Sequence, residues 1–155
     1  LDSNPLNLYL LKLRIVNMTD TLTPKERSQR MGLIRGKDTA PEMAIRSLVH
    51  KLGFRYRLHG KDLPGKPDLV FKRRKKVIFI HGCFWHRHPD KSCKLARLPK
   101  SRLDFWEPKL LNNAARDRKN IKQLESLGWN VLVIWECELK DKTFLNQTIQ
   151  AFLEP

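Results

Sequence analysis

The sequence DLVFKRRKKVIFI, residues 68–80, determines the fold that we expect for this chain. It holds two largely apolar runs, residues 68–71 and 77–80, on either side of a basic run at 72–76. Short runs rich in Val, Ile and Phe with polar residues at their ends are typical of β-strands. We therefore predict a hairpin with a basic turn, which is either a solvated loop or, as the less simple alternative, a phosphate contact.

Helix and strand patterns alternate on both sides of this hairpin. The stretches Thr23-Pro24-Lys25-Glu26 and Thr39-Ala40-Pro41-Glu42 have the capping residues of helix starts. Residues 131–135 form a continuous apolar run of the kind buried on both faces of a sheet. The patterns together predict strands over 54–58 and 131–135, and helices over 23–35, 39–52, 102–127 and 143–153. Such alternation predicts an α/β fold with a mixed sheet.

The formal net charge of this 155-residue chain is +15, because 31 Lys and Arg residues stand against 16 Asp and Glu residues. The basic residues are spread along the chain, which favours a folded surface that binds a polyanion. No apolar run reaches the roughly 18 residues of a membrane span, and Lys12 and Arg14 interrupt the apolar stretch at 6–16, which argues against a secretion signal. We expect an N-terminal extension over 1–17 and a single domain over 18–155.

The chain's three cysteines fit a metal site. Cys83, His88 and Cys93 lie in the irregular loop after the hairpin, and Cys137 follows the strand predicted at 131–135. Thiolates and imidazole suit tetrahedral zinc, and a site with four protein ligands is structural because no position remains for substrate. We predict a Cys₃His zinc site. The alternatives are His86 in place of His88, and a set of buried free thiols.

Two aspartates are candidates for a catalytic centre. Asp68 begins the hairpin after a loop rich in Gly and Pro, where a side chain can reach a ligand. A carboxylate there suits a metal-dependent phosphodiester hydrolysis, but it can equally cap a turn. Asp117 lies on the apolar stripe of the predicted long helix, so its charge needs a partner. That partner is His86 or a metal, with a salt bridge near Arg116 as the alternative.

Glu42 and a group of histidines are further candidates. The capping-box position of Glu42 directs its side chain to the Thr39 amide, whereas the apolar residues one turn later put the same helix face toward the core. His81, His86 and His88 fall together just beyond the second strand of the hairpin. Histidine acts as a base or an acid near neutral pH, so this group suits proton transfer.

Several aromatic residues stand at irregular or helix-start positions. Phe84 and Trp85 lie in the histidine-rich loop, and Phe105 and Trp106 begin the long helix. In a chain of charge +15 such side chains are candidates for wedges between the base steps of DNA. Core packing is the alternative. Met31, on the first predicted helix, is a similar candidate.

The chain contains four diagnostic stretches in order: DTAPE at 38–42, LPGKPD at 63–68, HGCFWH at 81–86 and WEC at 135–137. Together they resemble the very short patch repair (Vsr) endonucleases, over about residues 25–140. The resemblance implies a restriction-endonuclease-like fold, in which helices flank a mixed central sheet, with catalytic Mg²⁺ and structural Zn²⁺. It also implies a nick 5′ to the thymine of a T:G mismatch left by deamination of 5-methylcytosine, which initiates very short patch repair.

The resemblance gives each candidate residue a role. The catalytic residues would be Asp68, His81, His86, Asp117 and Glu42. Within this set, Asp68 and the Ile80 main-chain carbonyl would bind Mg²⁺, and His81 and Glu42 would organise metal-bound water. Asp117 would orient His86. The zinc ligands would be Cys83, His88, Cys93 and Cys137, and the residues that contact DNA would be Phe84, Trp85, Trp106 and Met31.

The resemblance also implies partners and a location. The partners would be double-stranded DNA with a T:G mismatch and, functionally, a cytosine-5 DNA methyltransferase. The protein would be a bacterial, cytoplasmic, nucleoid-associated monomer. Residues 80–82 lack the acid and lysine of the general restriction-fold signature, so a mechanism based on histidine is implied. Two alternatives remain open: a restriction-type endonuclease that cuts unmismatched DNA, and a zinc-stabilised module that binds DNA without cutting it.

Overall fold

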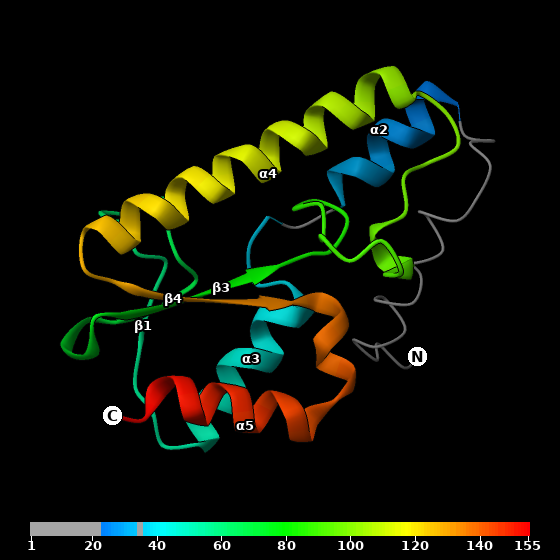
Figure 1. Ribbon diagram of the computed structural model, residues 1–155. Helices are drawn as coiled ribbons and strands as arrows, with labels where there is room; N and C mark the ends of the chain where they lie inside the picture. The colour runs from blue at the N-terminus through cyan, green and yellow to red at the C-terminus, as the bar shows by residue number, and fades with distance from the viewer. Residues whose placement is uncertain (1–22, 34–35) are drawn as a thin grey trace.

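A four-stranded mixed sheet lies at the centre of the computed structural model, which describes residues 23–33 and 36–155 (Figure 1). The strands follow the order β1 (Arg57–Leu58), β2 (Leu69–Phe71), β3 (Lys76–His81) and β4 (Asn130–Trp135). The first three pair antiparallel, and β3 pairs parallel with β4. The predicted hairpin and mixed sheet are thus confirmed. The extension predicted over 1–17 lies outside the described residues.

Four α-helices are described, and their bounds agree with the predicted ones to within a few residues. They are α2 (Pro24–Gly32), α3 (Ala40–Lys51), α4 (Leu103–Ser126) and α5 (Lys142–Leu153), with short 3₁₀ helices η1 (Lys72–Arg74), η2 (Lys94–Ala96) and η3 (Glu136–Lys140). The first helix ends earlier than predicted, because the Leu33 amide closes a turn on the Arg30 carbonyl. None of the described helices is long and apolar enough to cross a membrane.

Helices cover both faces of the sheet (Figure 1). Successive side chains of a strand point to opposite faces, and the buried residues of β2 and β3 divide accordingly. On one face the core combines α3 and α5 with Leu69, Phe71, Ile78, Ile80 and Ile134. On the other face Leu124 of α4 packs with Val70, Val77, Phe79 and Trp129. The sheet is therefore fixed on both sides, which gives its strand ends a rigid support.

The basic turn at 72–76 agrees with the predicted solvated loop, because residues 72–75 are exposed. It forms η1 with Lys75 in the left-handed region, and two of its side chains bind the end of α5. The Arg74 guanidinium donates to the Leu153 carbonyl at 2.9 Å, and the Lys76 ammonium donates to the Glu154 carbonyl at 2.7 Å. Cations near a helix C-terminus satisfy its free carbonyls and its dipole. These two side chains therefore stabilise the fold.

Two strand predictions need correction. The strand predicted over 54–58 is reduced to Arg57–Leu58, because it pairs with only two residues of β2. The strand at 130–135 packs on both faces, but less deeply than predicted: Leu132 and Ile134 contact one core, Val131 and Val133 the other, and only Ile134 is fully buried. β4 stands last in the described sheet and pairs with β3 alone among the described residues.

Candidate active site and metal centre

Asp68 lies at the entrance of β2, beside the end of β3. Its Oδ2 accepts a hydrogen bond from the Ile80 amide at 2.7 Å, which fixes the carboxylate against the neighbouring strand. Burial raises the pKa of Asp68, the Ile80 bond lowers it, and the negative charge of Glu42 raises it again, with a net rise. A half-buried carboxylate near a second carboxylate favours a bound cation, because the cation offsets both the lost hydration and the repulsion.

His81, His86 and Asp117 form a second cluster, although they come from three parts of the chain. The rings of His81, the last residue of β3, and His86, in the following loop, stack with centroids 3.9 Å apart and planes 7° apart. His86 Nδ1 lies 2.7 Å from Oδ2 of Asp117 on α4. The predicted partner of Asp117 is therefore confirmed as His86. One ligand atom of each of the three residues lies within 4.8 Å of the others.

The protonation states of this cluster follow from its contacts. Burial raises the pKa of Asp117, but the hydrogen bond and the charge of His86 together lower it by more, so the pKa lies below its usual value. An ionised carboxylate only accepts hydrogen bonds, so Nδ1 of His86 carries a proton and Nε2 is the nitrogen that exchanges one. Burial, together with the charge of His86, lowers the pKa of His81 to about 3. His81 is therefore neutral at neutral pH.

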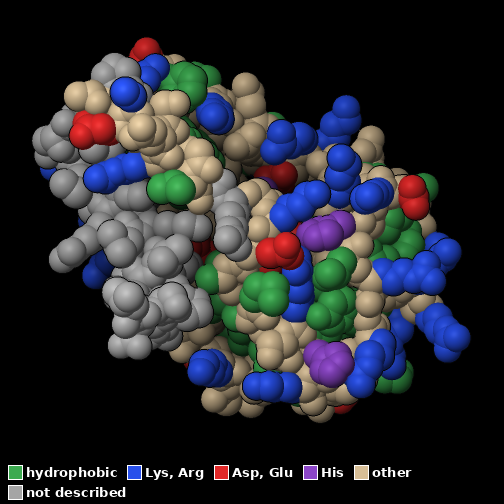
Figure 2. All heavy atoms as spheres, turned by 180° about the vertical axis from the view of Figure 1, so that it is seen from behind, with side chains coloured by type: hydrophobic (Ala, Val, Ile, Leu, Met, Phe, Trp, Pro, Cys, Tyr) green, Lys and Arg blue, Asp and Glu red, His purple; other side chains and the backbone are tan. Residues whose placement is uncertain are grey.

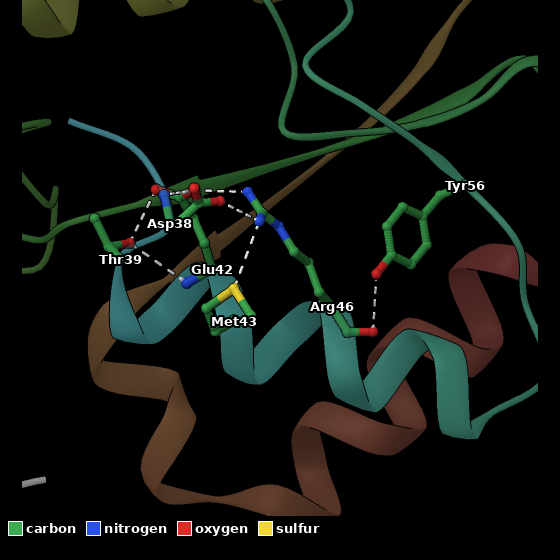
Figure 3. A network of polar contacts seen from close by, with 6 residues as sticks. All are labelled: Asp38, Thr39, Glu42, Met43, Arg46 and Tyr56. Atoms are coloured by element: carbon green, nitrogen blue, oxygen red, sulfur yellow. Dashed lines mark hydrogen bonds and ion pairs between the residues drawn. The ribbon is translucent and has the colours of Figure 1, made fainter. Parts of the chain in front are cut away.

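Glu42, in the first turn of α3, is held by three donors (Figure 3). Its carboxylate accepts from the Asp38 amide at 3.0 Å, the Thr39 hydroxyl at 2.9 Å and the Arg46 guanidinium at 2.9 Å. The sequence suggested a bond to the Thr39 amide, but the carboxylate binds the preceding amide and the Thr39 hydroxyl instead. It is also buried, with 7% of Glu42 exposed, and its charge acts on Asp68.

Three thiols gather where the loop that follows β3, which carries Cys83 and Cys93, meets Cys137 of η3. The sulfur atoms of Cys83, Cys93 and Cys137 lie within 4.8 Å of one another, and none is in a disulfide. Burial, followed by the effects of the adjacent thiols, raises the pKa of Cys83. Burial also raises the pKa of Cys137. A crowded set of thiols suits a soft divalent cation, since the cation supplies the positive charge that favours thiolates.

His88 lies next to this thiol cluster. Its Nε2 is 3.7 Å from Cys137 Sγ, and two ligands of one tetrahedral zinc ion stand roughly 3.6 Å apart. The three clustered thiols, with an imidazole beside one of them, have the donor chemistry of the predicted Cys₃His site. The Asp90 amide lies 3.1 Å from His88 Nδ1, and coordination through Nε2 would put the ring proton on Nδ1 and break that contact. The alternative ligand, His86, is instead held by Asp117.

The aromatic candidates form one cluster at the start of α4. Phe84 is 5.0 Å from Trp85 and 5.5 Å from Trp106, between ring centroids, and Trp85 is 6.0 Å from Trp106. These three rings are half-buried, and Phe105 beside them is 43% exposed. A set of rings that contact each other at the surface supports a role in contact with a ligand more than in the core. Met31 is 37% exposed on α2.

Three side chains that the sequence did not single out support these sites. Arg46 binds Glu42, Asn113 donates to the Trp85 carbonyl at 3.1 Å, and Glu136 accepts from the Cys83 amide at 3.2 Å. The first had a detectable signal, because oppositely charged residues four positions apart on a helix are neighbours. The other two contacts join segments 28 and 53 residues apart, so no local pattern reveals them.

Lys and Arg side chains are spread over the face of the molecule seen in Figure 2, where Asp and Glu side chains are few. This agrees with the formal net charge of +15. A surface of this kind attracts the phosphates of a nucleic acid over its whole area, and such binding weakens as the salt concentration rises.

Comparisons with known proteins point to one family. The profile of the family described as DNA mismatch endonuclease Vsr matches residues 19–94. The Type II nicking enzyme V.XorIIP of Xanthomonas oryzae pv. oryzae is 50% identical over 89% of this chain and 99% of its own length. The DNA mismatch endonuclease Vsr of Escherichia coli K12 is 42% identical over 81% of this chain and 78% of its own length.

A solved structure also resembles the fold. The catalytic domain of the homing endonuclease I-Bth0305I superposes with a TM-score of 0.51, covering 74% of this chain and 94% of that domain. The sequence identity is 20%, so this likeness concerns the fold alone.

Proposed function

Because this chain belongs to the family of the DNA mismatch endonuclease Vsr, we propose that it nicks the strand 5′ to the thymine of a T:G mismatch. The mismatch would arise by deamination of 5-methylcytosine, and the nick would initiate very short patch repair. That the chain is a DNA endonuclease follows from its relatives. The observation that carries the finer proposal is the placement of Asp68, His81 and the His86–Asp117 pair around the end of β3.

Asp68 and the Ile80 main-chain carbonyl are the proposed ligands of Mg²⁺. The Ile80 amide engages Oδ2 of Asp68, and Oδ1 has no hydrogen bond from the described residues, so one carboxylate oxygen stays available. Hard carboxylate and carbonyl oxygens are the ligands that Mg²⁺ prefers. When bound, Mg²⁺ supplies positive charge to the scissile phosphate and to the oxygens that attack and leave.

The remaining catalytic residues handle water and protons. Asp117 holds His86 with its proton on Nδ1, so Nε2 can give a proton to, or take one from, an oxygen at the phosphate. His81 is neutral and lies in the last position of β3, which suits a residue that orients the attacking water by hydrogen bonding. Glu42 contributes a fixed negative charge beside Asp68 and orients the same water.

The aromatic cluster is the proposed wedge beside the mismatch. Phe84, Trp85 and Trp106 would enter between base steps, since a mispaired step unstacks at a lower cost than a paired one. Met31, exposed on α2, would contact the opposite groove. Lys109 lies over the rings of Phe105 and Trp106, so a cation stands where the DNA backbone would pass.

Zinc is the proposed structural ion. Cys83, His88, Cys93 and Cys137 would hold it and would join the loop after β3 to the end of β4. That loop carries Phe84, Trp85 and His86, so the ion would fix both the wedge and the proton-transfer residue. The zinc ion would thereby tie the wedge and His86 to the sheet without taking part in the reaction itself.

The proposal extends to the cellular setting. T:G mismatches of this origin require a cytosine-5 DNA methyltransferase, so that enzyme would be a functional partner rather than a bound one. An asymmetric lesion cut on one strand is suited to a monomer. Because its substrate would be chromosomal DNA, the protein would act in the bacterial cytoplasm, at the nucleoid.

The test uses duplexes labelled on either strand, with a T:G, T:A or C:G pair at the same methyltransferase site, in Mg²⁺ or EDTA. We expect one Mg²⁺-dependent nick, 5′ to the thymine, in the T:G duplex alone. Equal cutting of the T:A duplex would replace the proposal with a restriction-type nuclease. Binding of T:G duplexes without any cut, across several sequence contexts, would leave a non-catalytic DNA-binding module.

A further inference from the structure

Arg46 is a buried cation beside the proposed catalytic carboxylates. Its side chain is 8% exposed, and its guanidinium contacts Oε2 of Glu42 at 2.9 Å and Oδ1 of Asp38 at 2.5 Å (Figure 3). Its charge also acts on Asp68. Arg46 thus reaches back along α3 to the two acidic side chains at the start of that helix.

Stability alone does not account for this arginine. Its Nε is buried without a hydrogen-bond partner among the described residues, and such an unsatisfied donor costs free energy. A buried ion pair typically adds little net stability, because desolvation offsets the attraction between the charges. The effect of Arg46 on the Asp38 and Glu42 carboxylates is therefore a better explanation for its burial than a gain in stability.

The start of α2 shows how a glutamate at the position of Glu42 bonds when it is exposed to solvent. Residues 23–30 repeat the pattern of residues 39–46, with Thr, then Glu, then Arg at the same spacing. In α2 the exposed Glu26 carboxylate bonds the amide and the hydroxyl of Thr23, as a capping box does. In α3 the Glu42 carboxylate bonds the Asp38 amide instead, and Arg46 holds the same oxygen, Oε2.

We propose that Arg46 is a positioning residue for the reaction, which holds the Glu42 carboxylate in place against the Asp38 amide. The inference rests on the function proposed above. Without the guanidinium on Oε2, the Glu42 carboxylate could turn to the Thr39 amide, as Glu26 does at Thr23. The site is then preorganised, because the carboxylate does not have to reorient when the substrate binds.

The test compares Arg46→Met, which removes the charge and keeps the side-chain length, with Arg46→Lys, which restores the charge. Each is made in the wild-type and the Glu42→Gln background. We expect Arg46→Met to slow single-turnover nicking at saturating DNA and Mg²⁺ at least tenfold, and Arg46→Lys to recover part of that loss. DNA affinity in Ca²⁺ should change less than threefold. In the Glu42→Gln background Arg46→Met should slow nicking less than twofold, because Arg46 acts through Glu42.

A second readout does not depend on activity. If Arg46 holds the Glu42 carboxylate, hydrogen exchange of the Asp38 amide should be at least fivefold faster in Arg46→Met than in wild type. The Thr23 amide, bound to Glu26 in the same kind of turn, is the internal control and should not change. Unchanged exchange at Asp38, or equal rate losses in both Glu42 backgrounds, would overturn the inference. A wild-type protein that nicks no duplex would instead overturn the proposed function, whatever the exchange data show.

Discussion

At the scale of single residues, the candidate site depends on a few contacts between distant parts of the chain. The His86–Asp117 pair joins residues 31 positions apart, and the Asp68–Ile80 bond joins residues 12 positions apart. Each contact fixes a polar side chain that would otherwise adopt several orientations. Replacing one partner therefore tests the role of the other.

Asp117→Asn should lower the single-turnover nicking rate by about 10²-fold or more, because the amide lacks the negative charge and can donate its NH₂ to Nδ1, which moves the proton of His86 to Nε2. His86→Ala should have a similar effect, and the double variant should be little slower than either single one. Asp104→Asn, an exposed acid at the start of the same helix, is the control. A normal rate in Asp117→Asn would remove this pair from the proposed mechanism.

The burial of His81 should make the stability of the fold sensitive to acid. Its pKa is lowered to about 3 in the folded protein, against 6.5 for an ordinary histidine, so only the unfolded chain takes up this proton between those values. The associated stability is complete above about pH 6.5 and is lost as the pH falls towards 3, by up to about 1.4 kcal/mol per pH unit. Urea unfolding between pH 7 and 5 should therefore show a steeper decline for wild type than for His81→Gln. Equal slopes would contradict the burial of a neutral His81.

At the scale of elements, local sequence predicted most of the fold. The two strands of the hairpin, the strand before η3 and the long helix before it were all correctly placed, since apolar runs and capping residues are local signals. The details that were not predicted depend on neighbouring elements. Two side chains of the basic turn bind the end of α5, and β4 is less buried than its apolar sequence suggested because it is paired along one edge.

The candidate site was predictable only in part. The proximity of His86 and Asp117 was inferred from the need of a charge on an apolar stripe, and the thiol cluster from the shared chemistry of its members. Arg46 and Glu136 were missed. The Glu42–Arg46 pair has a local signal, since the two charges lie four positions apart on one helix, whereas the contact of Glu136 with the Cys83 amide depends on where η3 turns back and has no local pattern.

The loop that leads to Asp68 packs closely against α4 through Gly65. Gly65 has φ +72°, and an added Cβ would lie 3.0 Å from Asn120 of α4. Gly128 has a similar φ of +79° but no atom within 4 Å of such a Cβ, so it is a matched control for backbone strain alone. Gly128→Ala should cost about 1 kcal/mol of unfolding free energy. Gly65→Ala should cost more, by urea unfolding, and equal costs would exclude the close approach.

At the scale of the whole molecule, the two proposed metal ions have separate tasks. Under the proposed function, the thiol cluster would hold the irregular loop to the sheet through zinc, whereas Asp68, beside the end of β3, would hold Mg²⁺. The basic surface would add affinity for DNA in general, and the cluster of rings at the start of α4 would add the preference for a weakened base step.

Zinc removal should destabilise the whole domain, since the free energy of metal binding contributes to folding. Metal analysis of purified wild type should find one zinc per chain, and Cys137→Ser and His88→Ala should each lose it with a lower melting temperature. His86→Ala should retain it, because that ring is bound to Asp117 instead. Loss of zinc in His86→Ala but not in His88→Ala would exchange the two assignments.

The most direct test of the central claim is single-turnover nicking of a T:G duplex in Mg²⁺ by wild type, Asp68→Asn and Asp62→Asn. Asp68→Asn keeps the shape of the side chain and removes the charge that would hold the metal, so the rate should fall about a thousandfold, or roughly 4 kcal/mol. Asp62→Asn, an exposed acid in the preceding loop, should cut at the wild-type rate. Nicking by Asp68→Asn at the wild-type rate would contradict the account, because the catalytic centre would then lie elsewhere.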